Sequence, residues 1–114
     1  PLAMAAGLAT IDAIEAENLM DNAARQGDAI RSGLKISLAD EIASGKVKDI
    51  RGRGLMIGIE LNQPCGALVQ KALDAGLLIN VTHDTVVRLL PPLVINDEET
   101  TELLKRLTVL VKAL

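Results

Sequence analysis

The feature that most constrains the fold is an alternating run in the middle of the chain. Within residues 50–61, IRGRGLMIGIEL, every second position from Leu55 to Leu61 carries a branched aliphatic side chain. A period of two sends successive side chains to opposite faces of a strand, whereas a helix repeats every 3.6 residues. The run therefore predicts a strand with one face against a core, entered through a glycine bend. Gly58 is expected where another element approaches closely.

The glycines in this run raise the alternative of a phosphate-binding loop. A dinucleotide-binding fingerprint needs G-x-G-x-x-G between a strand and a helix. Gly52 and Gly54 fit this spacing, but Ile57 occupies the third glycine position and no helix start follows. The P-loop signature also fails, because no Lys-Ser or Lys-Thr pair follows the glycines. The spacing favours a structural role.

Length and composition indicate one small domain with an aliphatic core. The chain has 114 residues, of which 49% are hydrophobic, and it contains no Phe, Tyr or Trp. The core must therefore come from Leu, Ile, Val, Ala and Met. A net charge of −3 and the absence of stacking rings argue against nucleic-acid binding. No run is long enough for a membrane span. A single cysteine excludes an internal disulfide and suits a reducing compartment.

Helical spacing predicts four helices. The first runs from Pro1 to about Ile14, and the second from about Leu19 to Ile42, after a start signal at Asn18 with Asp21. A third is expected over 65–75, where Gly76 provides the C-terminal cap. The last begins after Asn96, which forms a capping box with Glu99, and carries an apolar stripe of Leu103, Leu104, Leu107, Leu110, Val111 and Leu114.

Extended segments complete the expected architecture. Residues 47–50 lead into the alternating strand, and LLINV and TVVRLL form two short strands joined by a tight turn at THD. Pro91 and Pro92 stop the second of these. The predicted fold class is α+β: a small, mostly antiparallel sheet of three to four strands with helices packed on one face.

Most reactive side chains have a simple structural interpretation. His83 lies in the THD turn, where a dyad with the adjacent Asp84 is disfavoured and an exposed turn histidine is expected. One histidine and one cysteine cannot supply the three or four ligands of a zinc site, so no metal site is predicted. Cys65, near a helix start, is expected to be a small buried residue. Glu60 is expected to be exposed or at an interface.

Arg88 is the one candidate binding residue. It lies in VVRLLPPLV, between apolar neighbours, on a strand that prolines stop three residues later. A guanidinium at such a strand end can meet a carboxylate with two parallel hydrogen bonds. Spacing alone leaves open whether Arg88 is a site residue or an ordinary surface arginine.

Four segments then carry a family resemblance. They are, in order, PLAMAAGLATIDAIEAENL, VKDIRGRGLMIGIEL, ALDAGLLINV and VVRLLPPLVINDEE. Together they cover essentially the whole chain, and they resemble the C-terminal part of the class III pyridoxal-phosphate-dependent aminotransferases, most closely the acetylornithine aminotransferases.

The resemblance implies an enzymatic activity and assigns this chain to one domain of the enzyme. The family transfers the δ-amino group of N-acetylornithine to 2-oxoglutarate through pyridoxal 5'-phosphate (PLP), in arginine biosynthesis, as a cytoplasmic homodimer. Residues 1–114 would be the small C-terminal domain, with 1–16 as the interdomain helix. The large PLP-binding domain and its lysine would lie upstream, so this segment is expected to bind no cofactor and to be inactive alone.

At the level of single residues, one position of this chain matches a functional position of the family. Arg88, in RLLPPL, matches the family arginine that grips the substrate α-carboxylate. No catalytic or cofactor-binding position has a counterpart here, and no match is found for the lysines Lys35, Lys46, Lys48, Lys71, Lys105 and Lys112.

Two alternatives remain open at this stage. Ornithine, succinylornithine and aminobutyrate aminotransferases share much of the same pattern. A free-standing interaction module without catalytic ancestry would also explain a chain that lacks the cofactor lysine.

Overall fold

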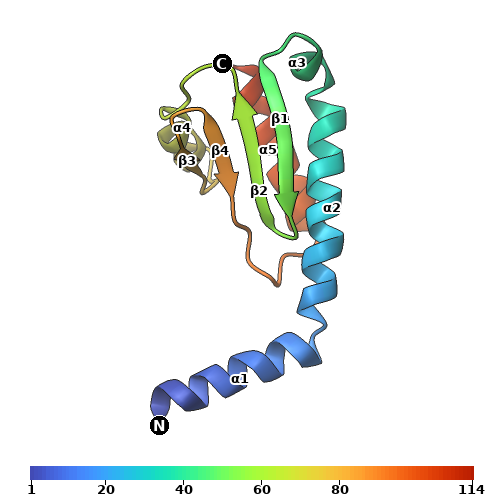
Figure 1. Ribbon diagram of the computed structural model, residues 1–114, viewed down its shortest axis with the longest axis vertical. Helices are drawn as coiled ribbons and strands as arrows, with labels where there is room; N and C mark the ends of the chain where they lie inside the picture. The colour runs from blue at the N-terminus through green and yellow to red at the C-terminus, as the bar shows by residue number, and fades with distance from the viewer.

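The computed structural model describes all residues from Pro1 to Leu114 and confirms the α+β class (Figure 1). Its elements, in chain order, are α1 (Leu2–Ala16), α2 (Leu19–Ser37), α3 (Ala39–Ala43), β1 (Val47–Arg53), β2 (Met56–Leu61), α4 (Leu68–Asp74), β3 (Asn80–Thr82), β4 (Val86–Leu89) and α5 (Asp97–Lys112). The strands form one sheet in the order β1-β2-β4-β3, and every neighbouring pair is antiparallel.

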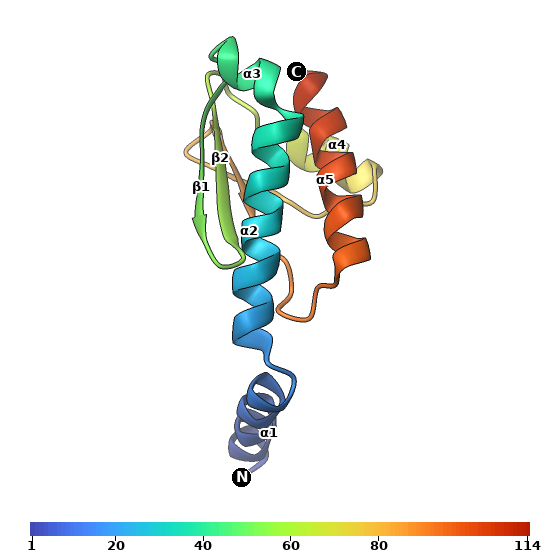
Figure 2. The ribbon, with the colours of Figure 1, turned by 90° about the vertical axis from the view of Figure 1, so that its right-hand side faces the viewer.

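Helices α2, α4 and α5 lie on one side of the sheet, as expected (Figures 1 and 2). The alternation in β2 decides which side chains face them. Ile57, Ile59 and Leu61 are almost completely buried. In β4, Val87 and Leu89 point to the same side. The intervening residues of both strands are therefore left on the face that no helix covers.

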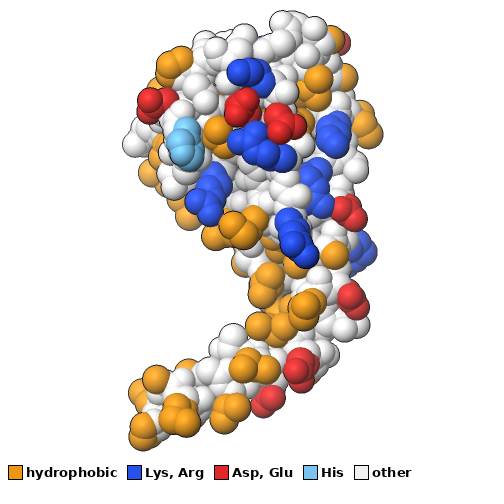
Figure 3. Space-filling model, in the orientation of Figure 1, with side chains coloured by type: hydrophobic (Ala, Val, Ile, Leu, Met, Phe, Trp, Pro, Cys, Tyr) orange, Lys and Arg blue, Asp and Glu red, His pale blue; other side chains and the backbone are white.

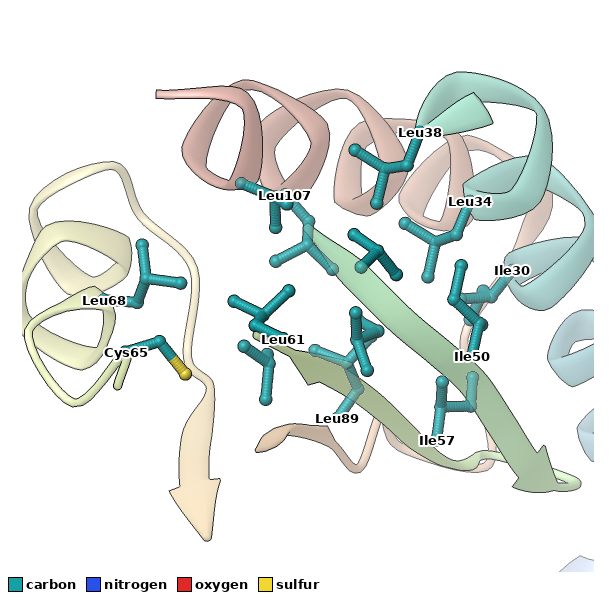
Figure 4. Close-up of a cluster of buried hydrophobic side chains, with 14 of the residues drawn as sticks. Ile30, Leu34, Leu38, Ile50, Ile57, Leu61, Cys65, Leu68, Leu89 and Leu107 are labelled. Atoms are coloured by element: carbon teal, nitrogen blue, oxygen red, sulfur yellow. The ribbon is translucent and has the colours of Figure 1, made fainter. Parts of the chain in front are cut away.

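The core is entirely aliphatic apart from one thiol (Figure 4). Side chains from α2 and α5 meet those of the sheet, and Leu68 of α4 closes one end. Ile30, Leu34 and Leu38 on α2 lie on its buried side, as the spacing predicts. The expected contribution of methionine is wrong, because Met4, Met20 and Met56 are all exposed. The buried members are Ile30, Leu34, Leu38, Val47, Ile50, Leu55, Ile57, Ile59, Leu61, Cys65, Leu68, Val87, Leu89, Ile95, Leu107 and Val111.

The glycine bend is the turn of a hairpin. Strand β1 continues to Arg53, and Gly54, with φ of +54°, reverses the chain into β2. Gly52 pairs with Ile57, and a Cβ at Gly52 would overlap the Met56 carbonyl oxygen. The expectation for Gly58 is wrong: a Cβ there would meet only ordinary contacts, the nearest at 3.5 Å from Val86. The close approach falls at Gly52 instead.

A second close contact fastens this hairpin turn to α2. A Cβ at Gly27 would overlap the carbonyl oxygen of Gly54. The same oxygen accepts a hydrogen bond from Arg31, one helical turn later, at 2.9 Å. The absence of a side chain at Gly27 therefore lets the turn rest directly on the helix backbone.

Two predicted helices differ at their ends. The second is interrupted at Leu38 (φ −106°, ψ 22°), so residues 39–43 form the separate α3. The sequence pattern did not show this break, because Leu38 keeps its apolar spacing and is fully buried. The third begins only at Leu68. Cys65 donates its backbone N–H to Asp84 at 2.8 Å, and this contact holds the preceding residues in a turn. Gly76, at φ +78°, follows α4 as predicted.

Helix α1 stands apart from the rest of the domain (Figures 1 and 2). None of its residues is buried, and Leu2, Met4 and Leu8 are largely exposed. Asn18 joins it to α2 and is the N-cap residue of that helix, so the predicted helix start is confirmed; Asn18 adopts the left-handed conformation, and its side chain makes no capping hydrogen bond. The interpretation of residues 1–16 as an interdomain helix stays a prediction.

Polar groups tie α2 to the start of α5. The predicted capping box is confirmed, with Asn96 and Glu99 exchanging side-chain and backbone hydrogen bonds. Buried Gln26 donates to Asp97 at 2.7 Å and accepts from Thr100 at 2.7 Å. Because both polar ends of Gln26 are satisfied, its burial carries no unpaired group.

We expect Gly27→Ala to lower the free energy of unfolding by about 1–3 kcal/mol, since the added methyl group must push the hairpin turn off α2. Urea unfolding of the purified chain measures this change. Gly7→Ala is the matched control, because a Cβ at Gly7 meets nothing within 4 Å. Equal stability of the Gly27→Ala variant and the parent would show that the hairpin turn at Gly54 does not rest on the α2 backbone at Gly27.

The Asp97 carboxylate should make stability pH-dependent. Hydrogen bonding from Gln26, followed by the charge of Arg25, lowers the pKa of Asp97 below its ordinary 3.8. Its contribution is therefore complete above pH 3.8 and disappears as the pH falls through the lowered pKa. Compared by urea unfolding, Asp97→Asn should be less stable than the parent at neutral pH, and the difference should shrink in acid. If the stability difference between Asp97→Asn and the parent stays constant in acid, ionisation of the Asp97 carboxyl does not contribute to folding stability.

Candidate functional site

The uncovered face of the sheet gathers charged side chains (Figure 3). Lys and Arg side chains spread over the strands there, with two acidic side chains among them. Strand alternation explains Glu60 in β2 and Arg88 in β4, because a residue between two buried ones must point to this face. In β1 the register is irregular between Val47 and Asp49; beyond it, Asp49, Arg51 and Arg53 lie opposite Glu60, Gly58 and Met56 and so share their face.

Strand pairing places Gly58 between two arginines. Gly58 lies opposite Arg51 on one side and opposite Arg88 on the other, and Arg88 in turn faces Asn80. Because Gly58 has no side chain, the surface is hollowed between the two guanidinium groups. The hollow has a volume of about 500 Å³ and is lined by Arg51, Gly52, Arg53, Met56, Ile57, Gly58, Thr82, His83, Val86 and Arg88.

Arg88 is exposed and has neither a hydrogen-bond partner nor an ion-pair partner within the chain, unlike its neighbour across Gly58. Arg51 lies 3.2 Å from Asp49 and 3.6 Å from Glu60, and Lys48 lies 3.8 Å from Glu60. The planar fork of Arg88 is thus free to receive an anion with two parallel hydrogen bonds. A carboxylate is the simplest group that fits.

A second hollow adjoins Arg88 on the side of β3. It is lined by Leu78, Ile79, Asn80, Arg88 and Leu90. Arg88 therefore borders a hollow on either side, and both hollows combine polar and apolar surface.

His83 lies in the β3–β4 turn and is exposed, as expected. It and Asp84 both adopt positive φ, at 52° and 63°. No hydrogen bond joins their side chains, so the disfavoured dyad is not formed. His83 nevertheless lines the same hollow as Arg88. Sequence reasoning did not bring these two residues together, because it treated the turn and the strand separately.

Cys65 is buried, as expected, and is the chain's free thiol. Burial, with a smaller effect from the negative charge of Asp84, raises the pKa of this thiol. Both effects disfavour the nucleophilic thiolate. No three His, Cys, Asp or Glu side chains are grouped where they could hold a metal ion.

No lysine lines either hollow around Arg88. Lys46 donates to the backbone oxygens of Lys112 and Leu114 at the end of α5, while Lys48 pairs with Glu60. Lys112 pairs with Glu41 at 3.1 Å. The side-chain amines of Lys46, Lys48 and Lys112 therefore make structural contacts.

The sequence pattern indicates Arg88 but not the residues around it. Arg51, Arg53 and Gly58 belong to a run that predicts only a strand entered through a glycine bend. The available signal was the two-residue alternation, which puts 51, 53 and 58 on the face opposite the core. The pairing of β2 with β4, which brings Gly58 beside Arg88, joins positions 30 residues apart and needed the structure.

Comparisons with known proteins identify the family of the chain. The chain belongs to the class-III aminotransferase family, whose family model matches residues 1–111. It is 53% identical to acetylornithine aminotransferase 1 of Bordetella pertussis over 113 residues, which cover 98% of this chain and 28% of that protein. It is 38% identical to the ornithine aminotransferase of Staphylococcus carnosus over 107 residues, covering 94% and 26%.

Solved aminotransferase structures share the fold of this chain. The ornithine aminotransferase from Toxoplasma gondii matches with a TM-score of 0.88 and 33% identity, covering 99% of this chain and 27% of that one, and its active site holds PLP at partial occupancy. The acetylornithine aminotransferase from Elizabethkingia anophelis matches with a TM-score of 0.87 and 28% identity, covering 100% and 30%.

The chain thus spans about a quarter of the length of the curated relatives it matches. None of the five helices combines the length and the apolar composition that crossing a bilayer requires.

We expect Cys65 in the native protein to react slowly with iodoacetamide at neutral pH, because its thiol is buried and its pKa is raised. Mass spectrometry after timed labelling measures the rate. Labelling in urea is the control, and there the rate should rise to that of an ordinary cysteine. Equally fast labelling with and without urea would show that the thiol is accessible in the native state.

Proposed function

We propose that residues 1–114 are the C-terminal region of a PLP-dependent acetylornithine aminotransferase, with Arg88 as the substrate-carboxylate anchor. The complete enzyme transfers the δ-amino group of N-acetylornithine to 2-oxoglutarate, in arginine biosynthesis. The observation that carries the proposal is the unpaired guanidinium of Arg88 on the open face of the sheet, in a chain of the class-III aminotransferase family.

The proposed reaction needs a carboxylate anchor of this kind. The amino donor and the oxo-acid acceptor occupy the same site in turn. In 2-oxoglutarate the α-carboxylate is attached directly to the reacting carbonyl carbon, whereas in N-acetylornithine it lies at the far end of the chain from the reacting δ-carbon. An arginine that is permanently charged and makes two parallel hydrogen bonds suits the carboxylate beside the reacting carbon, so we assign Arg88 first to the acceptor. Strand β4 is paired on both sides, so the anchor's backbone is fixed within the sheet.

PLP belongs to the proposal as the resident cofactor of the complete enzyme. When bound, it supplies the electron sink that lets an amino group be exchanged. Covalent attachment needs a lysine close to the cofactor. Since no lysine lines the hollows around Arg88, we assign that lysine, and the other cofactor contacts, to a part of the enzyme outside residues 1–114. This chain's own contribution is to bind and orient the substrate carboxylate.

Acetylornithine is the preferred substrate because enzymes with that name reach 53% and 43% identity, whereas three ornithine enzymes reach 38%, 39% and 41%. Ornithine, succinylornithine and aminobutyrate are the alternatives within the family. Family membership argues against the interaction module without catalytic ancestry. We further propose that the enzyme is a cytoplasmic homodimer.

In the full-length enzyme, Arg88→Ala should raise the KM value for 2-oxoglutarate by about ten- to a hundredfold, since a charged hydrogen-bonding pair is lost from that complex, and the KM value for N-acetylornithine by less. Steady-state kinetics measure both constants, and the absorbance of bound PLP checks that cofactor attachment is intact. Arg88→Lys should also impair binding, because a point charge does not replace the planar fork.

Unchanged KM values in Arg88→Ala would remove Arg88 from the substrate site. Comparing the parent enzyme with N-acetylornithine, ornithine, succinylornithine and aminobutyrate tests the substrate separately. A higher kcat/KM for one of the other three would keep the aminotransferase and replace the proposed donor.

A further inference from the structure

A carboxylate lies close to the proposed anchor on the same face of the sheet. Glu60 is opposite Val86 in the β2–β4 pairing, and Gly58 is opposite Arg88. Glu60 and Arg88 are therefore diagonal neighbours, whose Cα atoms lie roughly 7–8 Å apart in an antiparallel pair. Two long side chains can meet across that separation, so Glu60 is a potential internal competitor for the substrate's carboxylate.

The other two positions around this diagonal are Gly58 and Val86. Gly58 has no side chain, and Val86 leans towards it, with its Cγ1 atom 3.5 Å from where a Gly58 Cβ would lie. Valine is much shorter than glutamate or arginine, so the Glu60 and Arg88 side chains can approach each other above it.

Glu60 turns away from Arg88 and pairs with cations on β1. Its carboxylate lies 3.6 Å from Arg51 and 3.8 Å from Lys48. Arg51 also contacts Asp49 at 3.2 Å. These two cations and two anions balance one another in formal charge, and Arg88 is left as an uncompensated positive charge beside them.

Ion pairs of this kind add little to folding stability. The side chain of Arg51 is 49% exposed and that of Glu60 is 30% exposed, and exposed pairs contribute only about 0–1 kcal/mol. Their consequence for the binding site is larger, because they decide whether the guanidinium of Arg88 meets the solvent or a neighbouring carboxylate.

We propose that Arg51 is a positioning residue for substrate binding: by holding the Glu60 carboxylate on the β1 side of Gly58, it keeps the Arg88 guanidinium free for the substrate. Arg51 acts through Glu60 and does not itself contact substrate. The inference rests on the proposed function, since it concerns the same carboxylate anchor.

The test uses the full-length enzyme and a pair of substitutions. Arg51→Gln leaves Glu60 held only by Lys48, at 3.8 Å, so Glu60 competes for Arg88 and the KM value for 2-oxoglutarate should rise about twofold to fivefold, the effect of one exposed ion pair, while kcat stays unchanged. In an enzyme that already carries Glu60→Gln, adding Arg51→Gln should raise neither KM, because the competing charge is gone. Arg51→Lys keeps the cation and should leave both KM values close to those of the parent.

The matched control is Arg106→Gln. It removes an arginine from a similarly exposed pair with Glu102, at 2.8 Å on α5, and changes the net charge equally. Its KM values should equal those of the parent. Thermal melting of every variant confirms that the comparison is made between folded enzymes.

Three results would overturn the inference: unchanged KM values in Arg51→Gln, an equal rise in Arg51→Lys, or a rise that persists when Glu60 is also replaced. The last would make Arg51 a direct ligand. Failure of the proposed function is recognised separately, by the absence of transamination in the parent enzyme or by an Arg88→Ala variant with unaltered KM values.

Discussion

The structure depends on the two-sided pairing of β2 at a fixed register. Its alternation sends Ile57 and Ile59 into the helix layer and leaves Gly58 on the opposite face. A shift of one residue would reverse both sets of side chains, exposing the core and burying the charges. The same register aligns Gly58 with Arg51 and Arg88. Core formation and the geometry of the site are therefore set by one constraint.

The helix layer protects this register through backbone contacts. Gly27 on α2 admits the carbonyl of Gly54, and Arg31 donates to the same oxygen. At the neighbouring position on α2, Gln26 accepts a hydrogen bond from Thr100 and forms a satisfied buried pair with the start of α5. Since an all-aliphatic core has few directional interactions of its own, these polar contacts supply much of the specificity with which helix and sheet are aligned.

The sequence revealed most of the elements and the most important site residue. The alternation of 55–61, the Asn96 capping box and the Arg88 strand are local patterns, and local patterns were sufficient to predict them. The break at Leu38 was not predictable from the apolar spacing, which is the same on both sides of the break. The neighbours of Arg88 were missed because they are adjacent only through strand pairing, which no local pattern encodes.

The tight turn between β3 and β4 places a further limit on how this domain can change. His83 and Asp84 both adopt the left-handed conformation there, and the following strand carries Arg88 with Val87 and Leu89 on the opposite face. Gain or loss of a single residue in that turn would invert β4 and direct the guanidinium into the helix layer. Insertions and deletions in the family should therefore be excluded from this short turn, even though it lies at the molecular surface where length variation is usually harmless.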